Sequence, residues 1–181
     1  MCGIIGIQNN SEAATLAYMG LYAQQHRGQE GAGVVSSDGT ALHRHMGQGL
    51  VSDVFSDSAI FDTLIGDSAI GHVRYSTTGN SEPENVGPLT FNMGGYNLSV
   101  AHNGNLVNLD KIKTELHEDG ALFQTSTDTE IIIHLLAREK GDTLADKLEK
   151  VLQKIEGAYS LILLSPSEII AARDPHGIRP F

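Results

Sequence analysis

The chain has 181 residues, of which 40% are apolar and 19% are charged, and its formal net charge is −10. This composition predicts one globular domain over residues 1–181 and argues against disorder. The acidic balance argues against nucleic acid or membrane as a partner, and no apolar run is long enough to span a bilayer. With one cysteine and no signal peptide, we expect a cytoplasmic protein without disulfides or a multi-cysteine metal site.

The order of the predicted elements favours an α+β fold with antiparallel sheets. The apolar run at 2–7 predicts a buried first strand, and the run at 28–33 is so rich in glycine that we expect an irregular bend. Asp38-Gly39 predicts a hairpin, and Asn103-Gly104 predicts a tight turn. Helices are expected at 12–25, 106–118, 131–138 and 143–155, with one short helix or two at 50–64. Further strands are expected at 34–37, 41–45, 69–75, 97–102, 158–164 and 168–173.

The first residues also carry the strongest chemical signal. Cys2 follows the initiator methionine, so removal of Met1 would give it both a thiol and a free α-amine. The amine titrates at about pH 8 and the thiol at about 8.5, so the amine can accept the thiol proton. This is the logic of an N-terminal nucleophile. The alternative is that a lone cysteine is only a small buried hydrophobe.

Three polar groups at predicted strand ends and turns fit an amino-acid substrate. Arg74 suits a carboxylate, although for Arg74 taken alone a surface salt bridge is the favoured interpretation. Asn103-Gly104 offers two donors suited to an oxyanion hole, or a plain turn. Asp128 begins a helix, where it either caps the helix or holds an ammonium group. Together with a thiol, these groups fit glutamine, which would lose ammonia through a thioester.

His43 and His45 share a strand face, which is more typical of a surface than of a metal site.

The chain resembles the class II glutamine amidotransferases, most closely the glutaminase domain of the amidophosphoribosyltransferases. The matching runs occur in the family's order and extend along the whole chain. They are CGIIGI at 2–7, QHRGQEGAG at 25–33, GHVRYSTTG at 71–79, AHNGNLVN at 101–108, STDTE at 126–130, GAYSLILL at 157–164 and RDPHGIRP at 173–180.

This resemblance implies a fold and a set of site residues. The fold is a four-layer αββα sandwich of two antiparallel sheets, the N-terminal-nucleophile hydrolase fold. Cys2 would be the nucleophile, with its own α-amine as the base, and the oxyanion hole would consist of Asn103 and Gly104. The residues that would bind or enclose glutamine are Arg74, Thr77, Asp128 and Arg27.

The resemblance also implies the first step of de novo purine synthesis, in which ammonia passes to phosphoribosyl pyrophosphate. The phosphoribosyltransferase domain for that step, with its magnesium, is absent from this sequence, and the family's glutaminase domain continues beyond Phe181. We therefore expect a C-terminally truncated glutaminase that needs no cofactor or metal of its own, from a parent enzyme that forms a homo-oligomer. The alternatives are an inactive glutamine-binding or regulatory module, the glutaminase domain of another class II amidotransferase, or a hydrolase of the same fold that cleaves another amide.

Overall fold

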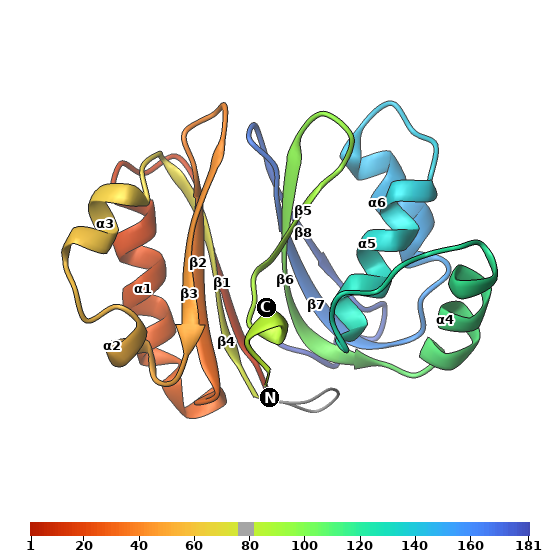
Figure 1. Ribbon diagram of the computed structural model, residues 1–181, viewed down its shortest axis with the longest axis horizontal. Helices are drawn as coiled ribbons and strands as arrows, with labels where there is room; N and C mark the ends of the chain where they lie inside the picture. Colours follow the sequence, from red (N-terminus) through yellow and green to blue (C-terminus); the bar gives the residue numbers. More distant parts are fainter. Residues whose placement is uncertain (76–81) are drawn as a thin grey trace.

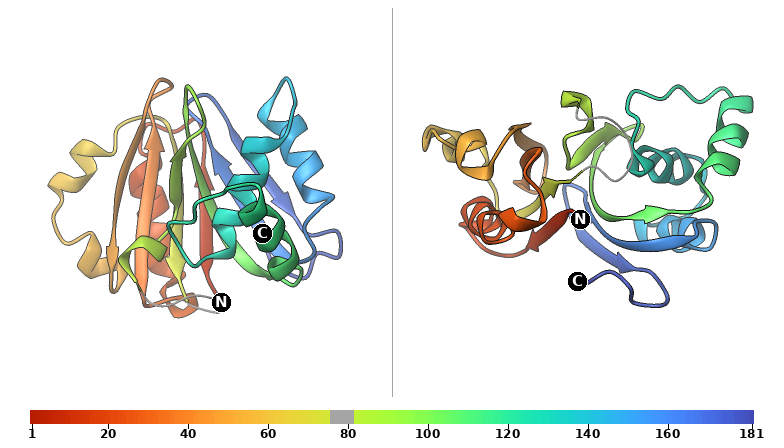
Figure 2. Two further views of the ribbon diagram at one scale, coloured as in Figure 1. Left: turned by 45° about the vertical axis from the view of Figure 1, so that its right-hand side comes forward. Right: turned by 90° about the horizontal axis from the view of Figure 1, so that it is seen from below.

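The computed structural model describes residues 1–75 and 82–181, and two four-stranded antiparallel sheets form its centre. The sheets lie face to face, and helices cover the outer face of each one (Figure 1). Two further directions of view show the same four layers (Figure 2). The predicted αββα sandwich is therefore confirmed.

The first sheet has the strand order β1-β4-β2-β3. Its outer face packs against α1, because small and apolar side chains recur along that helix at helical spacing and are buried there. The short helices α2 and α3 complete this layer. The bounds are β1 (Gly3–Ile7), α1 (Ala13–Ala23), η1 (Gln25–Arg27), β2 (Gly31–Ser37), β3 (Leu42–Gln48), α2 (Val51–Val54), α3 (Ala59–Thr63) and β4 (Ser68–Arg74).

The second sheet has the order β5-β6-β7-β8, and α5 lies at the centre of its outer layer. Eight of the eleven residues of α5 are buried, since it packs against β5 and β6 and also against α4 and α6. The bounds are η2 (Pro83–Asn85), β5 (Leu89–Asn92), β6 (Asn97–Leu106), α4 (Leu109–Glu118), α5 (Asp128–Arg138), α6 (Leu144–Leu152), β7 (Gly157–Leu164) and β8 (Ile169–Arg173).

A small apolar seam joins the two sheets. Its buried members are Val35, Ile70, Ala101, Ile162 and Leu164. Because side chains alternate along a strand, β4 turns His72 and Arg74 to the same inner face as Ile70. Antiparallel pairing of Gly3 with Val73 brings the start of the chain beside the end of β4. The seam therefore leads to the place where the predicted nucleophile lies.

Two of the predicted local structures are wrong, and tertiary packing explains both. The tight turn predicted at Asn103-Gly104 is instead the continuation of β6, which pairs with β7 as far as Leu106. The glycine-rich run is not irregular throughout, because β2 begins at Gly31. A Cβ atom on Gly33 would lie 2.5 Å from the carbonyl oxygen of Gly87, so that glycine makes room for a crossing segment. The strand β5 was not predicted.

Within residues 1–75 and 82–181, no helix has the length and apolar character needed to cross a membrane.

Candidate active site

The sulfur of Cys2 lies against the main chain at the end of β4. The N–H of Tyr75 donates to Sγ at 3.5 Å, and the thiol points back to the carbonyl oxygen of Tyr75 at 3.5 Å. This contact follows from the pairing of β1 with β4, which places the residue before Gly3 next to the residues after Val73. The nucleophile is therefore positioned by the first sheet, and its side chain is half-buried.

The carbonyl group of Cys2 is held by two of the predicted site residues. Arg27, in η1, donates from Nε to this oxygen at 3.0 Å. When the amide nitrogen of Asn103 faces Cys2, Nδ2 donates to the same oxygen at 3.1 Å and Oδ1 accepts from Arg27 Nη2 at 3.2 Å. The structure thus brings Arg27 and Asn103 directly to the main chain of the nucleophile.

A cavity of about 30 Å³ opens beside Cys2 between the two halves of the sandwich. Of the predicted residues, Arg74, Gly104 and Asp128 line it, whereas Arg27 and Asn103 line a separate hollow. Thr77 lies outside the described residues. The described lining consists of Cys2, His72, Arg74, Tyr75, Asn85, Gly87, Leu89, Val100, His102, Gly104, Thr127, Asp128 and Thr129.

Arg74 is not a surface residue, because only 6% of it is exposed. Its Nε lies 3.9 Å from Oε2 of Glu30, which comes from the segment that leads into β2. A guanidinium group in the lining of the cavity can bind an incoming carboxylate. The surface salt bridge that we weighed as an alternative does not describe this buried position.

Asp128 lies at the N-terminus of α5 and is 8% exposed. Its Oδ1 is 3.2 Å from Nδ1 of His102, and its Oδ2 accepts from the N–H of Leu106 at 3.3 Å. Burial raises the pKa of this carboxyl, but the charge and hydrogen bond of His102 and the N–H of Leu106 outweigh burial and lower the pKa below 3.8. The cavity therefore contains a fixed negative charge at neutral pH.

Gly104 has no room for a side chain. A Cβ atom there would lie 2.2 Å from the carbonyl oxygen of Ala158 and 2.9 Å from Nε2 of His102. The pairing of Gly104 with Tyr159 brings β7 this close. The absence of a side chain lets a ligand approach the main chain at this point.

Two histidines beside the thiol were missed in the sequence analysis. His72 and His102 are each 6% exposed, and both line the cavity. Burial raises the pKa of the Cys2 thiol, but the charge and hydrogen bond of His72, the Tyr75 main chain and the charge of His102 together bring the pKa to about 7. One sequence signal was present for His72, because it precedes Arg74 by two residues and so shares its strand face.

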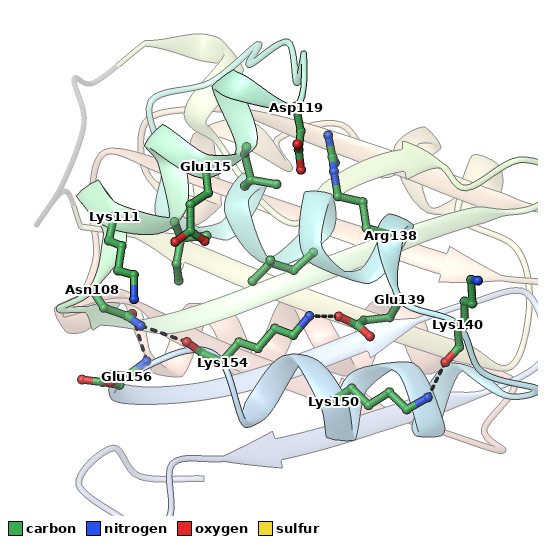
Figure 3. Close-up of a pocket in the computed structure, with 13 residues that line it drawn as sticks. Asn108, Lys111, Glu115, Asp119, Arg138, Glu139, Lys140, Lys150, Lys154 and Glu156 are labelled. Atoms are coloured by element: carbon green, nitrogen blue, oxygen red, sulfur yellow. Dashed lines mark hydrogen bonds and ion pairs between the residues drawn. The ribbon is translucent and has the colours of Figure 1, made fainter.

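A larger cavity, of about 750 Å³, lies among α4, α5 and α6 and has a charged lining (Figure 3). Lys154 pairs there with Glu139, and Lys150 donates to the carbonyl oxygen of Lys140 at 2.5 Å. Its described lining includes no cysteine, serine or threonine and shares no residue with the cavity at Cys2. Size alone therefore does not identify the reactive site in this protein.

Comparison with known proteins gives consistent matches. Residues 72–181 match the model of a glutamine amidotransferase domain. Over 99% of its length the chain is 42% identical to the amidophosphoribosyltransferase of Lacticaseibacillus casei, of which it covers 92%. It is 46% identical to that of Bacillus subtilis and 48% identical to the chloroplastic amidophosphoribosyltransferase 2 of Arabidopsis thaliana. The chain covers 38% and 32% of these two proteins, or about a third of their length.

Solved structures agree with the sequence matches. The structure of the B. subtilis glutamine phosphoribosylpyrophosphate amidotransferase, complexed with ADP and GMP, superposes with a TM-score of 0.92 at 44% identity. A structure described as the allosteric regulatory enzyme of purine biosynthesis gives 0.94, also at 44% identity. Each match covers 99% of this chain and 38% of the other.

Proposed function

Because the chain belongs to the glutamine amidotransferase domains of the amidophosphoribosyltransferases, we propose that it hydrolyses glutamine with Cys2 as the nucleophile. The observation that carries this proposal is the cavity itself. It places a thiol with a pKa of about 7 beside a buried arginine and a buried carboxylate. A nucleophile, a cation and an anion in one small cavity are what an amino acid with a reactive side-chain amide requires.

Substrate binding is proposed to use the two charges. Arg74 takes the α-carboxylate of glutamine, and Asp128 takes its α-ammonium group. Arg27, already bonded to the carbonyl oxygen of Cys2, helps to enclose the substrate. Thr77 is proposed to line the same pocket, on the resemblance alone.

The proposed reaction has two steps. The sulfur of Cys2 attacks the side-chain carbonyl carbon, and the Asn103 amide and the Gly104 N–H steady the oxyanion. Ammonia leaves, and water then hydrolyses the thioester to glutamate. The α-amine that Cys2 gains when Met1 is removed is a proposed base for the thiol proton. The hydrogen bond from Asn103 to the carbonyl oxygen of Cys2 supports the proposed oxyanion-hole role of Asn103, because it keeps this amide next to the nucleophile.

The role within a whole enzyme is proposed from the longer relatives. Ammonia from this domain would be used by a phosphoribosyltransferase domain, with its magnesium, to aminate phosphoribosyl pyrophosphate. A cytoplasmic location and a homo-oligomeric parent enzyme remain predictions.

Replacement of Cys2 by Ala in the full-length protein tests the nucleophile. We expect ammonia release from glutamine to fall to the background rate. The control variant His117→Asn, which changes an exposed residue of α4, should keep the wild-type rate. Mass spectrometry of the intact protein establishes whether Met1 has been removed.

Glutamine hydrolysis that survives in Cys2→Ala would refute the assignment. Tight glutamine binding by the wild type, with no ammonia and no adduct from a glutamine-like electrophile, would instead support an inactive binding module.

A further inference from the structure

Glu130 is a buried carboxylate that the proposed reaction does not use. It lies two residues after Asp128 in the first turn of α5 and is only 1% exposed. Its Oε1 accepts from the N–H of Gln124 at 2.8 Å, and its Oε2 accepts from the N–H and the hydroxyl group of Thr125 at 2.6 and 2.8 Å. A buried carboxylate destabilises a fold unless such donors surround it. Because all three donors come from two consecutive residues, the carboxylate fixes the turn that precedes α5.

The hydrogen bonds of Glu130 hold the approach to the helix rather than its first turn. Thr127 and Glu130 have the spacing of a capping box, in which the glutamate would bond to the N–H of Thr127. In the described part of the chain, however, the side chain of Thr127 makes no capping hydrogen bond. The N–H of Thr127 donates instead to the hydroxyl oxygen of Thr125 at 3.3 Å, and that hydroxyl group is held by Glu130. The carboxylate therefore fixes the path of the chain from 124 to 127.

A second buried residue, Asn85, holds the same turn. Asn85 is 1% exposed and lines the cavity at Cys2. Its Oδ1 accepts from the N–H of Ser126 at 3.1 Å, and its Nδ2 donates to the hydroxyl oxygen of Ser126 at 3.0 Å. The turn is thus bonded both to Glu130 and to a residue of the cavity wall.

The turn leads directly to Asp128, which lines the cavity. The carboxylate of Asp128 is oriented by His102 and by the N–H of Leu106, but these contacts can form only if the start of α5 is in place. A binding group has to be kept within about 0.5 Å of its productive position. The turn that Glu130 fixes provides this placement.

We infer that Glu130 is a positioning residue for substrate binding: by fixing the turn 124–127, it keeps Asp128 where the α-ammonium group of the substrate binds. This inference rests on the proposed function, which assigns that group to Asp128. Glu130 is not part of the described lining of the cavity, so its effect on the substrate passes through Asp128. Replacement of Glu130 should therefore reduce the preference of the site for amides that carry an α-ammonium group.

The test is a double-mutant cycle on the affinity for L-glutamine, measured by calorimetry in the full-length protein with Cys2→Ala, which prevents turnover. Glu130→Gln keeps the size of the side chain, but its amide nitrogen cannot accept, so at least one of the three hydrogen bonds is lost. We expect Kd for L-glutamine to rise about tenfold, the effect of weakening one charged hydrogen bond. When Asp128→Asn is already present, the same change should raise Kd by less than about twofold.

Glutaramate, which is glutamine without its α-ammonium group, distinguishes positioning from a general loss of structure. We expect its Kd to be the same with and without Glu130→Gln, because it offers Asp128 no positive charge. The matched control is Glu118→Gln, which changes an exposed glutamate of α4 and should leave Kd for L-glutamine unchanged.

An unchanged Kd for L-glutamine in Glu130→Gln would overturn the inference, and so would a rise that is equally large with and without Asp128→Asn. Thermal unfolding shows whether the variants are folded. Should Glu130→Gln fail to fold, Thr125→Val removes only the hydroxyl donor to Glu130. This milder variant must weaken L-glutamine binding more in protein with Asp128 than in protein with Asp128→Asn, and equal effects would again overturn the inference.

The proposed function is tested separately, in protein that retains Cys2. The expected coupling of Glu130 to Asp128 without any ammonia release would refute the glutaminase proposal and leave the role of Glu130 supported. Ammonia release by Glu130→Gln with the KM of the wild type would refute the role of Glu130 and leave the glutaminase proposal supported.

Discussion

At the scale of single residues, the cavity depends on charges that the protein has already partly neutralised. Asp128 interacts with His102, and Arg74 interacts with Glu30, before any ligand arrives. Each buried charge is therefore tolerated in the folded chain, because an opposite charge or a hydrogen-bond donor lies next to it. In our proposal, the α-carboxylate of glutamine joins the pair of Arg74 and Glu30, and its α-ammonium group joins the pair of Asp128 and His102.

The variant Asp128→Asn should weaken glutamine binding. It keeps the size of the side chain and an oxygen for the N–H of Leu106, but it removes the charge that we assign to the α-ammonium group. A charge-assisted hydrogen bond contributes about 1.5–3 kcal/mol, which corresponds to a rise in KM of roughly 10- to 100-fold. Steady-state kinetics of ammonia release give KM and kcat separately. The exposed Asp119→Asn is the matched control, and a KM equal to that of the control would exclude this role for Asp128.

The sequence predicted some residues of the site but not the residues that contact them. Arg74, Gly104 and Asp128 were expected to meet Cys2, and the cavity brings them together. The partners of these residues were not expected. Glu30 and His102 act through contacts across the fold, and a linear pattern does not state which residues will be in contact. His72 was visible on the face of Arg74, but its burial at the cavity of Cys2 appears only in three dimensions.

At the scale of elements, the site is assembled from strand ends and one helix start. The residue before β1 supplies the thiol, and β4 supplies Arg74. β6 supplies Asn103 and Gly104, and α5 supplies Asp128. The antiparallel α+β class followed from short strands paired through hairpins and from helices that come in groups, whereas the sandwich came from the resemblance. The tight turn predicted at Asn103-Gly104 was wrong because the pairing with β7 overrides the local turn preference.

The segment after β8 is organised by one carboxylate. Asp174 accepts hydrogen bonds from the N–H groups of Tyr159, His176, Ile178 and Arg179. Burial raises the pKa of this carboxyl, but these donors outweigh burial and hold the pKa below 3.8. A carboxyl whose pKa is lower in the folded state adds stability above its ordinary pKa, and this stability is lost as the pH falls through the lowered value.

The variant Asp174→Asn should therefore have a lower melting temperature than the wild type at pH 7. The difference between the two melting temperatures should become smaller below about pH 4. Thermal unfolding across a pH series measures this difference in melting temperature, and Asp62→Asn is the control because Asp62 is exposed. A gap that stays constant from pH 7 to pH 3 would contradict this account.

At the scale of the whole molecule, the two halves of the sandwich meet over a small apolar surface. The seam contains five buried residues, whereas the core beneath α4, α5 and α6 contains many more. Each side chain of the seam therefore carries a large share of the contact between the sheets. That contact also fixes the cavity, because Cys2 directly precedes β1 of one sheet and Gly104 lies in β6 of the other.

The variant Ile70→Ala tests the seam. Ile70 is fully buried, and a buried isoleucine replaced by alanine typically costs about 2–5 kcal/mol of unfolding free energy. Ile65→Ala is the matched control, because Ile65 is 49% exposed and should cost about 0.5 kcal/mol or less. Urea unfolding measures both. Equal losses in the two variants would show that the seam does not hold the sheets together.

The anchoring of Cys2 has a consequence for how the protein matures. Arg27 and Asn103 donate hydrogen bonds to the carbonyl oxygen of this residue, and the N–H of Tyr75 donates to its sulfur. None of these hydrogen bonds involves Met1. Met1 itself is 51% exposed and precedes the first strand. An aminopeptidase can therefore trim it from the folded protein, and the newly formed chain end stays where the fold has already fastened it.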